Sequence, residues 1–110
     1  SDSERMVQMK KQEMLFHRAI MKGFDIAKRE CKYNAAYFLV MVTDSGAVGA
    51  AKRLLAKDSV SDGFGTLYMY GRLDLTVEAY VVRPEFTELF KAAEIETARQ
   101  RLKGYGYNGA

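Results

Sequence analysis

The feature that most restricts the fold is a stretch at residues 4–32 that contains no proline and a single glycine. Met, Lys, Glu, Gln and Ala, which favour helices, make up much of it. Its apolar side chains recur at spacings of three and four residues, which places them on one stripe of a helix. They are Phe16, Ile20, Phe24, Ala27 and Cys31. The stretch therefore predicts a long amphipathic first helix.

The first half of this helix has a less regular pattern. Met6, Met9, Met14 and Met21 are spread around the helix rather than along the stripe. Methionine side chains are flexible and adapt to partner surfaces. We therefore expect residues 1–12 to project from the core or to pack against another chain.

Length and composition indicate one domain over residues 1–110. The chain has 110 residues, 48% of them hydrophobic, and one proline, whereas disordered chains are poor in large apolar residues. The longest apolar run, Ala35–Val42, has eight residues, and a membrane-spanning helix needs about 20. We expect no membrane span, and because the N-terminal residues lack the apolar core of a secretory signal, we expect a cytoplasmic location.

The middle of the chain predicts two helices that meet at a glycine. Residues 35–45 are apolar on nearly all sides, which is typical of a central buried helix, with Asn34 as its N-cap and Gly46 at its end. Residues 47–58 place Val48, Leu54 and their apolar neighbours on one side, which predicts a short amphipathic helix.

Residues 61–82 allow two interpretations. As strands, residues 75–82 alternate with a period of two, and YGRLD at 70–74 forms the turn of a hairpin. As helices, Ser61 or Asp62 caps the first, Gly71 ends it, and Asp74 caps a second that turns Leu75, Ala79 and Val82 inward. We favour helices because an isolated hairpin is marginally stable and no third strand is evident.

The last part of the chain also predicts helices. Pro84 is typical of a first helical position, and residues 91–104 place Ile95, Ala98 and Leu102 on one face before Gly104 ends the helix. The sequence as a whole predicts an all-α bundle of about five or six helices, with a long N-terminal helix followed by short ones.

Four motifs carry a resemblance to a known family. AAKRLLA at 50–56, SDGF at 61–64, GRLDLTVE at 71–78, and PEF at 84–86 followed by Leu89 and Phe90 are similar to those of a small prokaryotic domain of unknown function. The resemblance implies an all-helical fold and supplies no catalytic residue. Lys91 stands where the resemblance leads us to expect a Ser or Thr that caps the last helix.

The sequence offers little for cofactor or metal chemistry. Gly63, Gly65 and Gly71 match neither the phosphate-binding loop nor the dinucleotide fingerprint. The single His17 has no second histidine to share a metal, and Cys31 is the only cysteine, so no internal disulfide can form. We expect no cofactor and no metal.

Two carboxylates, Asp74 and Glu78, are spaced four residues apart and could act as an acid–base pair on a helix. The alternative is structural: Asp74 caps the helix, and Glu78 pairs with Arg72 or Arg53. Since the sequence shows no evident nucleophile, we favour the structural roles and expect no enzyme.

The basic residues suggest one binding surface. Lys11, Arg18 and Lys22 share a face of the first helix, and Lys52 and Arg53 extend the set. Such a row can follow the phosphates of a nucleic acid, although the net charge is only +3. The leading hypothesis is a non-catalytic accessory module that binds nucleic acid or a larger protein. The alternative is a protein-interaction or self-association module with no nucleic-acid role, which the scattered methionines favour.

Overall fold

The computed structural model describes residues 1–108. It contains five α-helices and two short 3₁₀ helices, and no strand occurs within this range. The elements follow in the order α1 (Asp2–Cys31), α2 (Ala36–Leu55), α3 (Asp62–Met69), η1 (Leu73–Leu75), α4 (Val77–Val81), η2 (Pro84–Leu89) and α5 (Ala92–Gly104). The all-α prediction is confirmed, and the hairpin interpretation of residues 61–82 is excluded.

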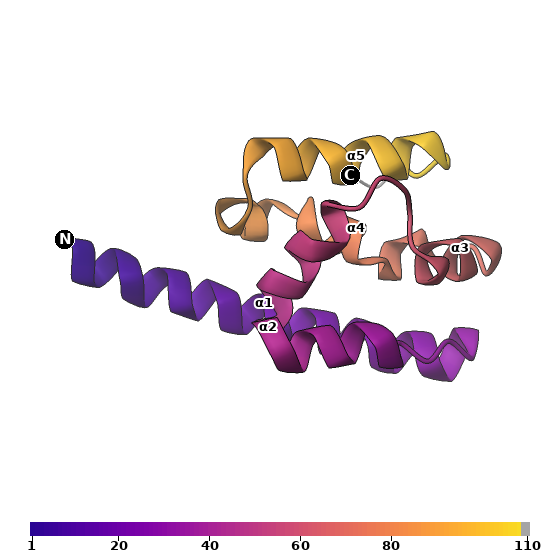
Figure 1. Cartoon of the computed structure of the whole chain (residues 1–110), viewed down its shortest axis with the longest axis horizontal. Helices are drawn as coiled ribbons and strands as arrows, with labels where there is room; N and C mark the ends of the chain where they lie inside the picture. The colour runs from indigo at the N-terminus through magenta and orange to yellow at the C-terminus, as the bar shows by residue number, and fades with distance from the viewer. Residues whose placement is uncertain (109–110) are drawn as a thin grey trace.

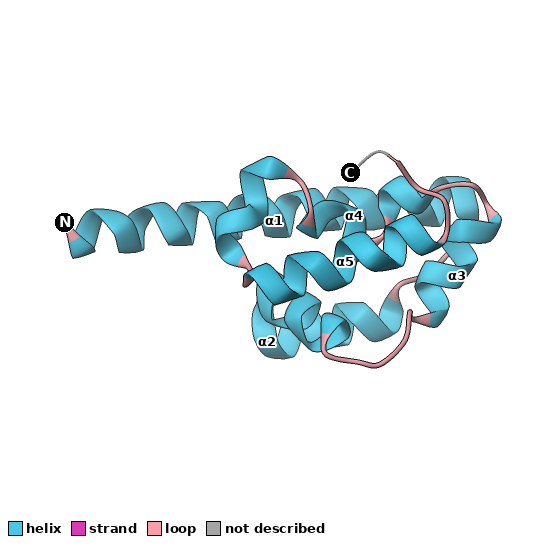
Figure 2. Ribbon diagram, turned by 90° about the horizontal axis from the view of Figure 1, so that it is seen from above, coloured by secondary structure: helices cyan, strands magenta, loops and turns pink. Residues whose placement is uncertain are grey.

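Helix α1 is capped at both ends. The Ser1 hydroxyl accepts a hydrogen bond from the backbone N–H of Glu4, and Lys32 ends the helix in the left-handed conformation at φ 53°. The buried residues form the expected stripe from Phe16 to Cys31, with Phe24 half-buried. Before Phe16 no residue of α1 is buried, although Met9 is partly buried against the core, and Figures 1 and 2 show the start of α1 extending past the other helices. We call residues 1–15 the projecting segment.

Helix α2 is a single bent element. Gly46 interrupts it with φ 76° and ψ 167°, a conformation that suits glycine alone, so the two helices expected on either side remain joined at a kink. The predicted Asn34 cap is wrong: Ala35 occupies the cap position, and no side chain caps the helix. Tyr37 and Val40 are 75% and 68% exposed. The expectation of a helix buried on all sides is therefore wrong for α2.

Two side chains cap the N-termini of α3 and α4. The Ser61 hydroxyl accepts from the N–H of Phe64, as predicted. The second cap is Thr76, whose hydroxyl accepts from the N–H of Ala79 and donates to the carbonyl of Leu73. The prediction that Asp74 caps this helix is wrong because Asp74 lies within η1 and pairs with Arg72.

The central helix is α4. All five of its residues are buried, and α1, α2 and α5 pack around it; Figure 1 shows it between α5 and α1. Helix α5 buries Ala98 and Leu102 against it, and Ile95 is half-buried. Before α5, Pro84 opens a 3₁₀ helix. The amphipathic helices thus surround a short helix whose five residues are all buried.

Candidate functional site

The projecting segment exposes large apolar side chains. Met6, Val7, Met14 and Leu15 are 62%, 68%, 56% and 41% exposed. Val7, Met14 and Met21 follow at intervals of seven residues, which places them close together along one side of α1. An isolated helix of this length is marginally stable in water. This part of α1 therefore offers an apolar surface that the described chain does not cover.

The sequence suggested five basic residues as one nucleic-acid surface, and the structure divides them into two groups with different surroundings. Lys11, Arg18 and Lys22 are exposed on α1, and none forms a salt bridge within residues 1–108. Lys52 instead binds Glu94, with 2.7 Å between Nζ and Oε1, and Arg53 binds Asp44 at 3.2 Å. The two residues of α2 are thus engaged in internal ion pairs, which leaves the row on α1.

Arg72 bridges two parts of the chain. Its guanidinium donates two hydrogen bonds to the carboxylate of Asp74, at 3.0 and 3.2 Å, and a third to Glu30 on α1. These bonds fasten η1 to the end of α1. Asp74 is therefore held in a structural pair, and it does not line the cavity that Glu78 lines.

Glu78 is the buried acid of the molecule, with 1% of its surface exposed. The predicted pairing with Arg72 or Arg53 is wrong, since its partner is Arg101 of α5, at 3.2 Å between the guanidinium and Oε2. The same guanidinium donates to the backbone carbonyls of Leu54 and Lys57 at 3.3 and 2.6 Å. Burial raises the pKa of Glu78 even though its backbone hydrogen bond and Arg101 act in the opposite direction.

Arg101 is the residue that sequence reasoning missed. Its signal is weak: it precedes the buried Leu102, so it stands at the edge of the buried face of α5. Glu78 itself lies between apolar residues on both sides in the sequence, Val77 and Ala79. Such a setting predicts a buried acid that needs a cation, but it does not identify which of the 17 Lys and Arg residues supplies it.

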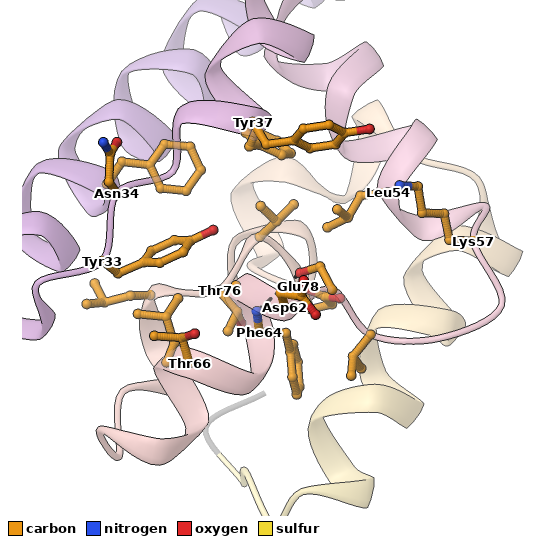
Figure 3. A pocket seen from close by; sticks show the side chains of 18 of the residues that line it. Tyr33, Asn34, Tyr37, Leu54, Lys57, Asp62, Phe64, Thr66, Thr76 and Glu78 are labelled. Atoms are coloured by element: carbon orange, nitrogen blue, oxygen red, sulfur yellow. Dashed lines mark hydrogen bonds between the residues drawn. The ribbon is translucent and has the colours of Figure 1, made fainter.

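A cavity of about 540 Å³ opens between the α1–α2 turn, the end of α2 and the start of α3. Figure 3 shows Tyr33 at the left, Tyr37 at the top and Lys57 at the right, with Asp62, Phe64 and Glu78 lower in the centre of the view. Tyr33 lies so close to Gly63 that an added Cβ would come within 2.1 Å of its hydroxyl oxygen. Burial, and then the charge of Asp62, raise the pKa of Tyr33. The cavity thus combines aromatic walls with carboxylates.

The remaining features to place are possible metal ligands, the single histidine, the single cysteine and any long apolar helix. Within residues 1–108, no group of three His, Cys, Asp or Glu side chains is placed to hold a metal ion. His17 is exposed on α1, and Cys31 is a buried free thiol. Over the same range no helix is long and apolar enough to span a membrane.

Comparisons with known proteins give no relative. No family model, no curated protein and no solved structure matches this chain. The resemblance carried by the GRLDLTVE motif stays a prediction.

Proposed function

We propose that this chain is a non-catalytic interaction module that self-associates through the projecting segment. One observation carries the proposal: residues 2–15 are helical, yet none of them is buried, and four of their large apolar side chains face solvent. Exposed apolar surface of this kind marks interaction sites. The pairing of Asp74 with Arg72, and of Glu78 with Arg101, supports structural rather than catalytic roles for these carboxylates.

The charge distribution of α1 favours a second copy as the partner. The acids Asp2 and Glu4 stand near its start, Arg5 follows them, and the base Arg18 lies further along. Two copies that pair antiparallel, with Val7 of each opposite Met14 of the other, bring the acids at the start of each helix near Arg18 of the other. In an antiparallel pair the two helix dipoles point in opposite directions, and this arrangement is electrostatically favourable. Val7 and Met14 then supply the apolar contact between the helices.

Sedimentation velocity of the full chain, over a range of concentrations, tests this proposal. We expect a dimer that Val7→Gln combined with Met14→Gln dissociates, because polar side chains remove the apolar contact. Val40→Gln is a matched control: Val40 is 68% exposed, as Val7 is, but lies on α2. A wild-type chain that sediments as a monomer at every concentration would contradict the proposal, as would equal effects of the control and the double variant.

Nucleic-acid binding is the second candidate function, and a separate observation favours it. Lys11, Arg18 and Lys22 are exposed, share one face of α1, and form no salt bridge within residues 1–108. Cations at such spacing can contact successive phosphates of a duplex. This function rests on those three residues alone, because Lys52 and Arg53 bind Glu94 and Asp44.

Titration of the full chain into a labelled DNA duplex at several salt concentrations tests this second function. We expect affinity that falls steeply with salt, and loss of most of it in Lys11→Glu combined with Arg18→Glu. Lys28→Glu combined with Lys103→Glu makes the same change in net charge at exposed residues outside the row. Salt-independent binding, or an equal loss in both double variants, would refute it.

A further inference from the structure

We propose that the cavity beside Tyr33 binds a small organic cation, an ammonium ion with an aromatic or aliphatic body. The charge lies near Asp62, and the body lies against the aromatic walls. The site is separate from the projecting segment, because its residue from α1 is Phe24 and its other walls come from the α1–α2 turn and later elements. The inference is therefore independent of self-association and of nucleic-acid binding.

The size and lining of the cavity suit a small molecule. Its volume of about 540 Å³ lies within the range of roughly 300–1,000 Å³ that is usual for ligand pockets. Five aromatic residues line it, and they come from three parts of the chain that the fold brings together. They are Phe24, Tyr33, Tyr37, Phe38 and Phe64. Such walls contact a flat or branched apolar body on several sides.

Among the polar groups of the lining, Asp62 is the one placed to attract a positive charge. Glu78 and Asp62 are the carboxylates, and Lys57 is the cation. Arg101 neutralises Glu78, whereas Asp62 forms no salt bridge within residues 1–108. Burial, and then the charge of Asp62, raise the pKa of Tyr33, so this charge lies near the cavity wall. Lys57 offsets the formal charge of Asp62, so the aromatic walls and the position of Asp62, and not a net negative charge, favour a cationic ligand.

The structure also shows how a cation sits against these walls. The Nζ atom of Lys57 lies over the ring of Tyr37, 5.5 Å from its centroid. A ligand ammonium beside the same rings gains the same attraction to the aromatic faces, the interaction that recognises quaternary ammonium groups in aromatic cages. Lys57 therefore occupies a position that the ligand cation could take, and it competes with the ligand for the Tyr37 ring.

Three probes of similar size test the proposal by NMR titration of the full chain: benzyltrimethylammonium, the neutral benzyl alcohol and the anion phenylacetate. We expect saturable binding of the cation, with shifts in the signals of Tyr33 and Phe64, and weaker binding of the other two. Asp62→Asn should lower the affinity for benzyltrimethylammonium about fivefold, the effect expected for the loss of one partly exposed ion pair. Asp58→Asn is the matched control, since Asp58 is exposed in the loop that precedes α3 and does not line the cavity.

Lys57→Met provides an independent second variant. It removes the competing cation while its backbone carbonyl still accepts from Arg101, so affinity for benzyltrimethylammonium should rise. Tighter binding of phenylacetate, equal binding of benzyl alcohol, or no saturation by about 10 mM would overturn the proposal. Equal effects of Asp62→Asn and Asp58→Asn would also overturn it. Thermal unfolding of each variant confirms that the fold is retained.

Discussion

Arg101 satisfies three acceptors from two distant parts of the chain, the Glu78 carboxylate and the carbonyls of Leu54 and Lys57. Its side chain is 9% exposed and that of Glu78 is 1% exposed. A buried ion pair of this kind adds little net stability compared with an apolar pair, because both charges lose hydration. Removal of one partner is a different matter, since it leaves the other charge buried without compensation.

Arg101→Met should therefore destabilise the fold by about 3–5 kcal/mol at pH 7, which urea unfolding measures. The matched control is Arg99→Met, since Arg99 is exposed on the same helix, and it should change the free energy of unfolding by less than about 0.5 kcal/mol. The double variant Glu78→Gln with Arg101→Met should recover part of the loss because no charge remains buried. A loss below about 1 kcal/mol in Arg101→Met would show that the pair is well hydrated.

The pH dependence of stability should carry the signature of Glu78. Burial raises its pKa in the folded state above its ordinary value of 4.5, so the folded chain binds a proton that the unfolded chain has already released. This contribution is fully present below 4.5 and is lost as the pH rises through the folded pKa. Without Arg101 the pKa rises further, so Arg101→Met should be less harmful at about pH 5 than at pH 7. Equal losses at both pH values would contradict this assignment.

Glycine 23 should tolerate no side chain. An added Cβ would come within 2.4 Å of the Tyr80 hydroxyl oxygen, so Gly23→Ala forces α1 away from α4. We expect a loss of about 1–3 kcal/mol in the free energy of unfolding. Gly65→Ala is the matched control within a helix, because its Cβ meets nothing within 4 Å, and it should stabilise by about 0.5–1 kcal/mol. The same sign of change in both variants would be unexpected.

The helices themselves follow closely from local sequence. Spacings of three and four predicted the buried stripe of α1, and the cap of α3 is Ser61, one of the two residues predicted for it. One error arises where two local signals compete. Asp74 is a good capping residue by type, but Arg72 engages its carboxylate, and Thr76 caps the helix instead. Both competing side chains lie two residues from Asp74, so residue type at one position did not decide the cap.

The candidate sites were harder to predict than the helices. Spacing alone was enough to find the basic row of α1. It could not show that Lys52 forms an ion pair with Glu94, because the two residues are 42 positions apart in the sequence. The cavity could not be predicted, since Tyr33, Lys57 and Asp62 meet only after α2 bends and returns. A periodic pattern reports which face of a helix is apolar. It does not report which other helix covers that face.

The kink of α2 depends on one residue. Gly46 adopts φ 76° and ψ 167°, a region that residues with a Cβ almost never occupy, so Gly46→Ala should destabilise by about 1–3 kcal/mol. Its position is open, with nothing within 4 Å of an added Cβ, so any loss reports backbone strain rather than a clash. Gly104→Ala is the control in helical conformation and should be neutral or stabilising; an equal effect at both positions would refute a special role for the kink.

The molecule is elongated, with extents of 46 × 25 × 22 Å, because α1 continues past the core. Hydrogen exchange should reflect this division: amides of residues 5–15 should exchange faster than those of residues 20–30, which pack on the core. Dilution should increase the difference, since self-association protects the projecting segment. Equal protection along α1 at low protein concentration would show that the projecting segment is stable by itself. Exchange rates that do not change with protein concentration would count against self-association.

The position of α4 bears on what truncation does to the chain. Its five residues are buried, and α5, which covers them, comes last in the sequence. A premature stop codon just before residue 92 would remove the helix that shields α4 from water. The shortened product would expose the surface of a buried helix, which chaperones bind and through which chains aggregate.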